Sequence, residues 1–171
     1  MNLRRFISVA KWLSDEKKLE LFPPFWMMRL NVTTLTNNWR EIRIKLPRTW
    51  VSRNHGGGIF GGFQASLADP IAAIACTKVF PGYAVWTRSL HLDFQHEANT
   101  DITLHFDLSD EMKTRIKKDL ESKGRSTPTF TMYFKRTDGT VCTLIKNTVA
   151  IRPMNYKKPT KQSVTSQLNK N

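Results

Sequence analysis

The residues with the clearest chemical potential are a side-chain amide, a pair of glycines and a carboxylate between positions 54 and 69. Asn54 comes first, Gly61 and Gly62 follow it, and Asp69 lies seven residues beyond Gly62. A carboxylate can act as a general base or as a nucleophile. Unpaired main-chain amides at the start of a helix favour negative charge, and glycine lets a ligand touch the backbone. Together these residues contain the parts of a site that activates an attacking group and stabilises an oxyanion.

Each of these residues also has a purely structural interpretation. The glycines can form a tight turn from loop to helix that binds no ligand. Asn54 is a common turn residue, and Asp69 can be a structural carboxylate at a subunit interface. Residue type and spacing alone leave both interpretations open.

The segment that must position these groups runs from Phe63 to Val79 and is apolar almost throughout. Strands rarely run that long, so the segment predicts a helix. A helix that is apolar all round is expected to be buried on every side, wrapped by a larger element. Asp69 then needs a partner, because an ionised group is costly to bury. Pro70 removes one helical hydrogen bond beside it and is expected to tilt or kink the helix.

The spacing of Gly62 and Asp69 has a consequence for assembly. Seven residues place the two on nearly the same helix face, but about 10 Å apart along the axis. One reacting atom cannot easily meet both groups on a single helix. A second, antiparallel copy across a twofold axis would bring Asp69 of one subunit near Gly62 of the other. The spacing therefore favours an isologous dimer.

Composition and charge narrow the possible classes of protein. The chain has 171 residues, of which 40% are hydrophobic, and this suits one globular domain. Its net charge of +13 attracts polyanions, such as nucleic acid, anionic membrane or a phosphate-bearing ligand, although a solvated basic surface is the simpler interpretation. We expect no specific nucleic-acid partner, no transmembrane segment and no secretory signal, since none of the corresponding patterns is present. Cys76 and Cys142 lie in apolar contexts, which predicts buried free thiols and a reducing, cytoplasmic location.

The remaining pattern predicts an antiparallel sheet. Alternating or β-branched segments separated by turn signals predict six strands, at residues 28–36, 39–46, 83–95, 99–108, 127–135 and 140–151. Asp138-Gly139 predicts the tight turn of the last hairpin. The charged segment 109–123, with Ser109 as its cap, predicts an exposed helix between strands. The expected fold class is therefore α+β, with a curved antiparallel sheet of about six strands wrapped around one long helix.

Three segments follow one another along the chain. Residues 1–24 contain a predicted amphipathic helix over 3–21, which the sequence Phe22-Pro23-Pro24-Phe25 ends. This helix either docks on the domain or lies on a membrane surface. Residues 25–152 form the sheet and central helix, and residues 153–171 are expected to be a basic, flexible tail.

The motif at the central helix resembles that of the hotdog-fold superfamily, which is best known for acyl-CoA thioesterases. Members of the phenylacetate-pathway type carry Asn, five residues, His-Gly-Gly, six residues and Asp, with Leu-Ala before the Asp. Here Asn54 is followed by five residues, Phe60-Gly61-Gly62, six residues and Asp69, with Leu67-Ala68 before Asp69. The spacing matches without a gap, and Phe60 replaces the histidine. A branch of the superfamily is similar in having a phenylalanine there.

The resemblance implies hydrolysis of an acyl-CoA or similar thioester at the interface of a homodimer or a dimer of dimers. In such a site Asp69 acts as base or nucleophile, the Gly61 and Gly62 amides stabilise the oxyanion, and Asn54 positions water or the partner's aspartate. The candidate substrate-binding residues are Gly57, Phe60, Gln64 and Ser66. Coenzyme A enters as part of the substrate, with no separate cofactor. The histidines lack metal-ligand spacing, so no metal is expected.

Other functions stay open. Phe60 cannot donate the hydrogen bond that a histidine would, so a non-catalytic acyl or acyl-CoA binding module of the same fold is the alternative. A third class, nucleic-acid or membrane binding through the basic surface, would need tight and steeply salt-dependent affinity. Dehydratase chemistry is disfavoured, since the predicted central helix contains no histidine.

Overall fold

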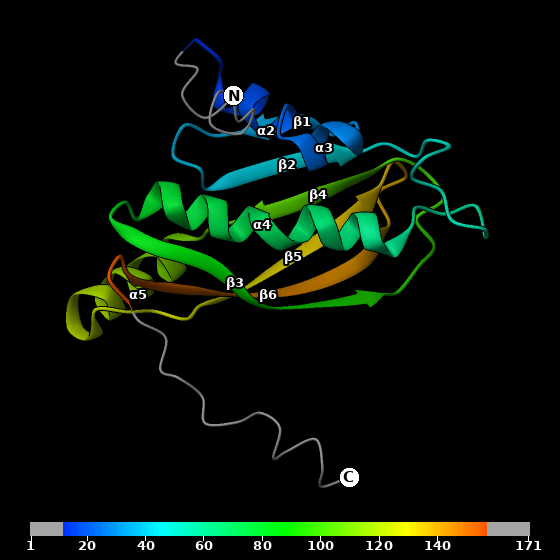
Figure 1. Cartoon of the computed structure of the whole chain (residues 1–171). Coiled ribbons are helices and arrows are strands. Elements are labelled where there is room, and N and C mark those ends of the chain that lie inside the picture. Colours follow the sequence, from blue (N-terminus) through cyan, green and yellow to red (C-terminus); the bar gives the residue numbers. More distant parts are fainter. Residues whose placement is uncertain (1–11, 157–171) are drawn as a thin grey trace, which may run out of the picture.

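The computed structural model describes residues 12–156, in which a six-stranded sheet curves around one long helix (Figure 1). The helices are α2 (Asp15–Glu20), α3 (Pro23–Met27), α4 (Gly61–Val79) and α5 (Asp110–Lys123). The strands are β1 (Asn31–Leu35), β2 (Glu41–Leu46), β3 (Tyr83–Phe94), β4 (Ile102–Asp107), β5 (Thr129–Arg136) and β6 (Val141–Pro153). Their neighbours in the sheet run in the order β1-β2-β4-β5-β6-β3, and every pairing is antiparallel. This is the hotdog fold, as the sequence predicts.

The alternation of apolar residues along the strands explains how the sheet packs on α4. In β2, Ile42 and Ile44 are buried, whereas Arg43 between them lies on the other face. In β4, Leu104 and Phe106 are buried in the same way. Because successive side chains of a strand point to opposite faces, one face of the sheet is apolar and packs against the helix.

The helix α4 is not buried on every side, so that expectation is wrong. Ser66, Asp69, Thr77 and Lys78 are exposed, while Leu67 and other residues of the helix are fully buried. The reason is that the sheet remains open: β1 and β3 are separate edges, so the strands cover only one side of the helix. Asp69 therefore has access to water in the single chain, and its charge does not require an internal partner.

The N-terminal region differs from the single helix predicted over residues 3–21. Residues 1–11 lie outside the described part of the chain, and residues 12–14 are not helical. The helix α2 begins at Asp15 because Ser14 is extended and its side chain accepts a hydrogen bond from the Lys17 amide over 3.4 Å. The two prolines end α2 and also start α3, since proline suits the first positions of a helix.

The other elements agree with the predicted pattern. Ser109 caps α5 by accepting from the Met112 amide over 3.2 Å, but Ile116 and Leu120 of this helix are buried, so only its other face is exposed. Both cysteines are free and buried, as expected. Within residues 12–156 we find no helix that is long and apolar enough to cross a bilayer.

Candidate functional site

A pocket of about 460 Å³ opens at the N-terminal end of α4. It is lined by three segments that meet there: the loop before α4, the first turn of α4, and the end of β3 with the residues that follow it. The lining residues are Asn54, Gly58, Ile59, Phe60, Gly61, Gln64, Phe94, His96, Glu97 and Ala98. A hydrogen bond of 2.9 Å from the Ile59 amide to the Ala98 carbonyl joins the first and last of these segments.

Two aromatic rings lie close against the glycines at the start of α4. A Cβ atom at Gly61 would lie 2.9 Å from Cζ of Phe94, closer than real Cβ atoms come to other atoms. A Cβ atom at Gly62 would overlap the ring of Phe60. The Phe60 amide donates to the Ser52 carbonyl over 2.8 Å, which fixes the loop where it enters the helix. The glycines thus let the rings of Phe60 and Phe94 lie against the helix end.

The first two amides of α4 have no acceptor among the described residues. The Phe63 amide already bonds the Phe60 carbonyl over 3.0 Å, whereas no hydrogen bond from the Gly61 or Gly62 amide is present within residues 12–156. No side chain caps this end of the helix, because its N-cap residue is Phe60. The free amides and the helix dipole together favour a negatively charged or partly charged oxygen at this position.

Gln64 lies at the inner wall of the pocket and is almost fully buried. Its side-chain oxygen accepts a hydrogen bond of 2.7 Å from the Thr143 hydroxyl, and its side-chain nitrogen donates to the Ile59 carbonyl over 3.3 Å. These contacts tie α4 to β6 and to the preceding loop. Gln64 therefore holds the pocket wall in place.

Asp69 does not line this pocket. It lies two helical turns further along α4, and no residue within 12–156 donates a hydrogen bond to its carboxylate. Its main-chain carbonyl, however, accepts from Thr87 over 2.6 Å and from Asn147 over 2.9 Å. The structure thus holds the backbone at Asp69 firmly and leaves the side chain exposed.

The other predicted site residues divide into those that line the pocket and those that do not. Asn54, Phe60 and Gly61 meet at the pocket with Gln64, whereas Gly57, Gly62, Ser66 and Asp69 are not among its lining residues. The Gly57 carbonyl accepts a hydrogen bond of 2.7 Å from Nε of Arg48. The exposed Ser66 hydroxyl donates to the Gly62 carbonyl over 2.8 Å.

Glu97 is a potential functional residue that the sequence pattern does not reveal. It contributes the one carboxylate among the residues that line the pocket, and its side chain approaches Gly58. The only local signal is a polar run, His96-Glu97, after a predicted strand. Its place beside the start of α4 depends on the pairing between Ile59 and Ala98, which no spacing in the sequence encodes.

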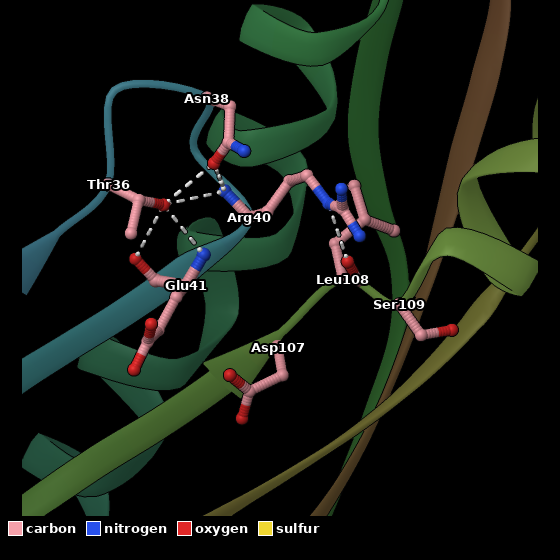
Figure 2. A pocket seen from close by; sticks show the side chains of 7 residues that line it. All are labelled: Thr36, Asn38, Arg40, Glu41, Asp107, Leu108 and Ser109. Atoms are coloured by element: carbon pink, nitrogen blue, oxygen red, sulfur yellow. Dashed lines mark hydrogen bonds between the residues drawn. The ribbon is translucent and has the colours of Figure 1, made fainter.

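A second pocket, of about 270 Å³, lies where the turn between β1 and β2 meets the end of β4. Figure 2 shows that its polar groups already bond one another: Thr36 and Asn38 hold the turn, and Nε of Arg40 donates to the Leu108 carbonyl over 3.1 Å. The carboxylates of Glu41 and Asp107 both pair with Arg43, at 3.3 and 2.8 Å. The polar groups of this pocket thus join the β1–β2 turn to the end of β4. No group of three or more His, Cys, Asp or Glu residues within residues 12–156 is placed to hold a metal ion.

Comparison with known families decides the classification. The model of a family described as a domain of unknown function, DUF4442, matches residues 11–151. The chain belongs to this family. No curated protein matches the sequence of this DUF4442 protein.

Similar solved structures agree with the fold of the DUF4442 protein. PA5026 from Pseudomonas aeruginosa, a protein of unknown function also named "Probable Thioesterase", has a TM-score of 0.71 at 18% identity, covering 82% of this chain and 96% of that chain. Thioesterase HI1161 from Haemophilus influenzae has a TM-score of 0.63 at 10% identity, covering 84% and 94%. Thioesterase SAV0944 from Staphylococcus aureus has a TM-score of 0.59 at 15% identity, covering 75% and 97%. At these identities the similarity establishes the shared fold.

Proposed function

We propose that this DUF4442 protein is a cytoplasmic thioesterase that hydrolyses acyl-CoA at a site shared by two subunits of a homodimer. The observation that carries the proposal is the pair of free amides at Gly61, which lines the pocket, and at Gly62, which follows it in the first turn of α4. The aromatic rings of Phe60 and Phe94 form part of the pocket wall. Similarity in fold to HI1161, which is named a thioesterase, supports the same reaction class.

The free amides define where the thioester carbonyl would sit. As water attacks the carbonyl carbon, a carboxylate accepts the water proton and the developing oxyanion accepts hydrogen bonds from the amides. When the intermediate collapses, the carbon–sulfur bond breaks and the leaving thiolate takes up that proton. Phe60 and Phe94 provide apolar surface for the acyl chain, since both rings are about half exposed at the pocket mouth.

Asp69 is the proposed base or nucleophile, and it would act across the subunit interface. Within one chain it lies about 10 Å along the helix axis from Gly62, too far for both to contact one carbonyl group. The exposed side of α4 adjoins the open edge strand β3, where Trp86 is exposed. A second copy packed antiparallel on this side would bring its aspartate toward Gly62, with the exposed Asn54 placed to orient water.

Glu97 offers a competing carboxylate from the same chain, and a matched pair of variants separates the two. We expect Asp69→Asn to lower kcat for thiol release from acyl-CoA by about 100-fold or more, as is typical for loss of a catalytic base. Glu97→Gln should change kcat by only a few-fold. The measurement is a panel of acyl-CoA thioesters with thiol release followed for the parent and both variants. The reverse result would place the base within one chain and remove the need for the dimer.

The alternative function is a non-catalytic acyl or acyl-CoA binding module. The observation that favours it is Phe60, which stands at the pocket mouth and has no group able to donate a hydrogen bond to the substrate. Calorimetric titration with each acyl-CoA, followed by analysis of the recovered ligand, distinguishes the two functions. Tight binding with no thiol released by the parent protein would establish the module and overturn the thioesterase.

A further inference from the structure

The region around α2 and α3 exposes three large apolar side chains. Trp12 is 77% exposed, Trp26 is 65% exposed and Met27 is 69% exposed. The helix α2 packs against β1, which is the sheet edge opposite β3. A second copy docked on β3 would therefore leave this region uncovered. Trp26 and Met27 are consecutive residues of α3, and exposed apolar side chains that adjoin one another mark an interaction surface rather than a solvated one. We call this region the α2–α3 surface.

A groove of about 400 Å³ lies within the α2–α3 surface. Leu21, Trp26 and Leu30 give it apolar walls, and Lys17 and Arg29 give it positive charge. Lys17 is already paired with Glu20, at 2.6 Å, whereas no carboxylate within residues 12–156 pairs with Arg29. Apolar walls beside a free guanidinium match an amphiphile with an anionic head group.

The backbone at Arg29 adopts a conformation that does not itself call for an arginine. Arg29 has φ of 55°, the left-handed conformation that glycine adopts most easily. Its amide bonds the Trp26 carbonyl over 2.9 Å and the Leu30 amide bonds the Phe25 carbonyl over 3.1 Å, which is the Schellman arrangement at the end of α3. Glycine would satisfy this turn with less strain, so the turn alone does not explain an arginine here.

The charge of Arg29 and of the whole chain has the matching sign. Within residues 12–35 three basic residues balance three acidic ones, so the unpaired Arg29 supplies the positive charge at the groove, and the whole chain carries a net charge of +13. Lys11 directly precedes Trp12 in the sequence, and Arg4 and Arg5 lie eight and seven positions before it. Several basic residues next to exposed tryptophan are typical of proteins that bind the surface of an anionic membrane.

We propose that the α2–α3 surface docks on an anionic phospholipid bilayer. Trp26 and Met27 enter the layer between head groups and acyl chains, and Arg29 binds a lipid phosphate. A bilayer accepts this combination because apolar side chains can reach the hydrocarbon boundary while a guanidinium stays among the phosphates. This proposal is independent of the thioesterase proposal, since it uses none of the residues at the pocket of α4.

Flotation of the full chain with vesicles tests the proposal. We expect the parent to bind phosphatidylcholine vesicles that contain phosphatidylglycerol, and to bind pure phosphatidylcholine vesicles far less. The double variant Trp26→Ser/Met27→Ser should lower partitioning about tenfold or more through loss of buried apolar area. The matched control is Met154→Ser, because Met154 has the same exposed fraction as Met27, 69%, but follows β6. This control should bind as the parent does.

A second variant separates binding from folding. Arg29→Gly should keep or raise the melting temperature, because glycine relieves the left-handed backbone, and should weaken binding to anionic vesicles several-fold. The proposal is overturned if the parent does not bind anionic vesicles or binds neutral ones equally well. It is also overturned if the double variant or Arg29→Gly binds like Met154→Ser. A change of oligomeric state in the double variant with vesicle binding intact would identify a protein contact instead.

Discussion

Asn147 of β6 donates a hydrogen bond of 2.9 Å from its side-chain amide to the main-chain carbonyl of Asp69 in α4. The same amide group donates to the Ala68 carbonyl over 3.2 Å, and the Thr87 hydroxyl also donates to the Asp69 carbonyl. The helix is thus fastened to two neighbouring strands at the candidate catalytic carboxylate. Because both acceptors are carbonyl oxygens, Nδ2 of Asn147 must face them. Its Oδ1 is then left buried without a partner in the described chain.

These hydrogen bonds from Asn147 predict that an aspartate at this position is less stable than a leucine. Asn147→Leu removes the donors but also removes the unpartnered oxygen, so we expect a loss of about 1–2 kcal/mol in the free energy of unfolding. Asn147→Asp keeps the shape of the side chain but places a carboxylate oxygen against the two carbonyl oxygens. It should therefore lower the free energy of unfolding more than the leucine variant does. Urea unfolding at neutral pH measures both. If the aspartate variant were the more stable of the two, Oδ1 of Asn147, and not Nδ2, would have to face the two carbonyl oxygens.

Gly62 is predicted to matter more for the reaction than for stability. A methyl group in Gly62→Ala would overlap the Phe60 ring, but that ring is half exposed and can turn away. We therefore expect less than about 1 kcal/mol of destabilisation, in keeping with a surface change. Thiol release should fall at least tenfold, because the displaced ring or the new methyl group obstructs the free amides. Gly61→Ala, whose new methyl group would approach the equally exposed Phe94 ring, is the comparison and should destabilise by a similarly small amount. A fully active Gly62→Ala variant would argue against an oxyanion at this amide.

Glu20 is expected to stabilise the protein in a pH-dependent way. Burial alone would raise the pKa of this carboxyl group, but hydrogen bonds from Lys17 and from the Val32 amide outweigh that effect and lower the pKa below its ordinary value of 4.5. A carboxylate with a lowered pKa stabilises the folded state above its unfolded-state pKa, and loses this effect as the pH falls through the folded-state pKa. At pH 7, Glu20→Gln should lower the free energy of unfolding by about 1 kcal/mol, which is the usual net contribution of such a hydrogen bond.

The difference between the parent and Glu20→Gln should then shrink as the pH falls below about 4.5. Denaturation curves for both proteins across this pH range measure it. Glu16→Gln is a suitable control, because it changes a carboxylate in the same helix, α2. A difference that stays constant down to the acid limit would show that the carboxylate of Glu20 does not stabilise the contact with β1.

The two cysteines should be unreactive in the folded protein. Burial raises the pKa of the Cys76 thiol to about 12, and burial also raises the pKa of Cys142. Because the thiolate is the reactive form, both should react with a disulfide reagent at pH 8 at least about 100-fold more slowly than a free thiol. Unfolding in denaturant should release two reactive thiols per chain. Rapid reaction of either thiol in the native protein would contradict its burial. If the prediction holds, thiol-release assays will need no correction for the protein's own cysteines.

The sequence by itself predicts the local elements well. The apolar run after the glycines specifies a helix, and the alternation of Ile42 and Ile44 with charged residues specifies a strand with one buried face; both are confirmed. These features are readable because periodicity and turn residues act over short stretches of chain. The start of α2 after Ser14 does not follow from the sequence, because a serine inside a helical pattern can be either a cap or an ordinary helical residue, and only the geometry shows which.

Only the tertiary structure decided which groups meet. The sequence places Asp69 in the same buried helix as Gly62, but the open sheet leaves Asp69 exposed and outside the pocket. Gln64 is held by Thr143 and the Asp69 carbonyl by Asn147, partners that lie 79 and 78 residues away along the chain. Glu97 reaches the pocket through the pairing of two loops. Periodicity reports which face of an element is apolar, whereas the partner of a polar group depends on strand order and packing, which arise from long-range contacts.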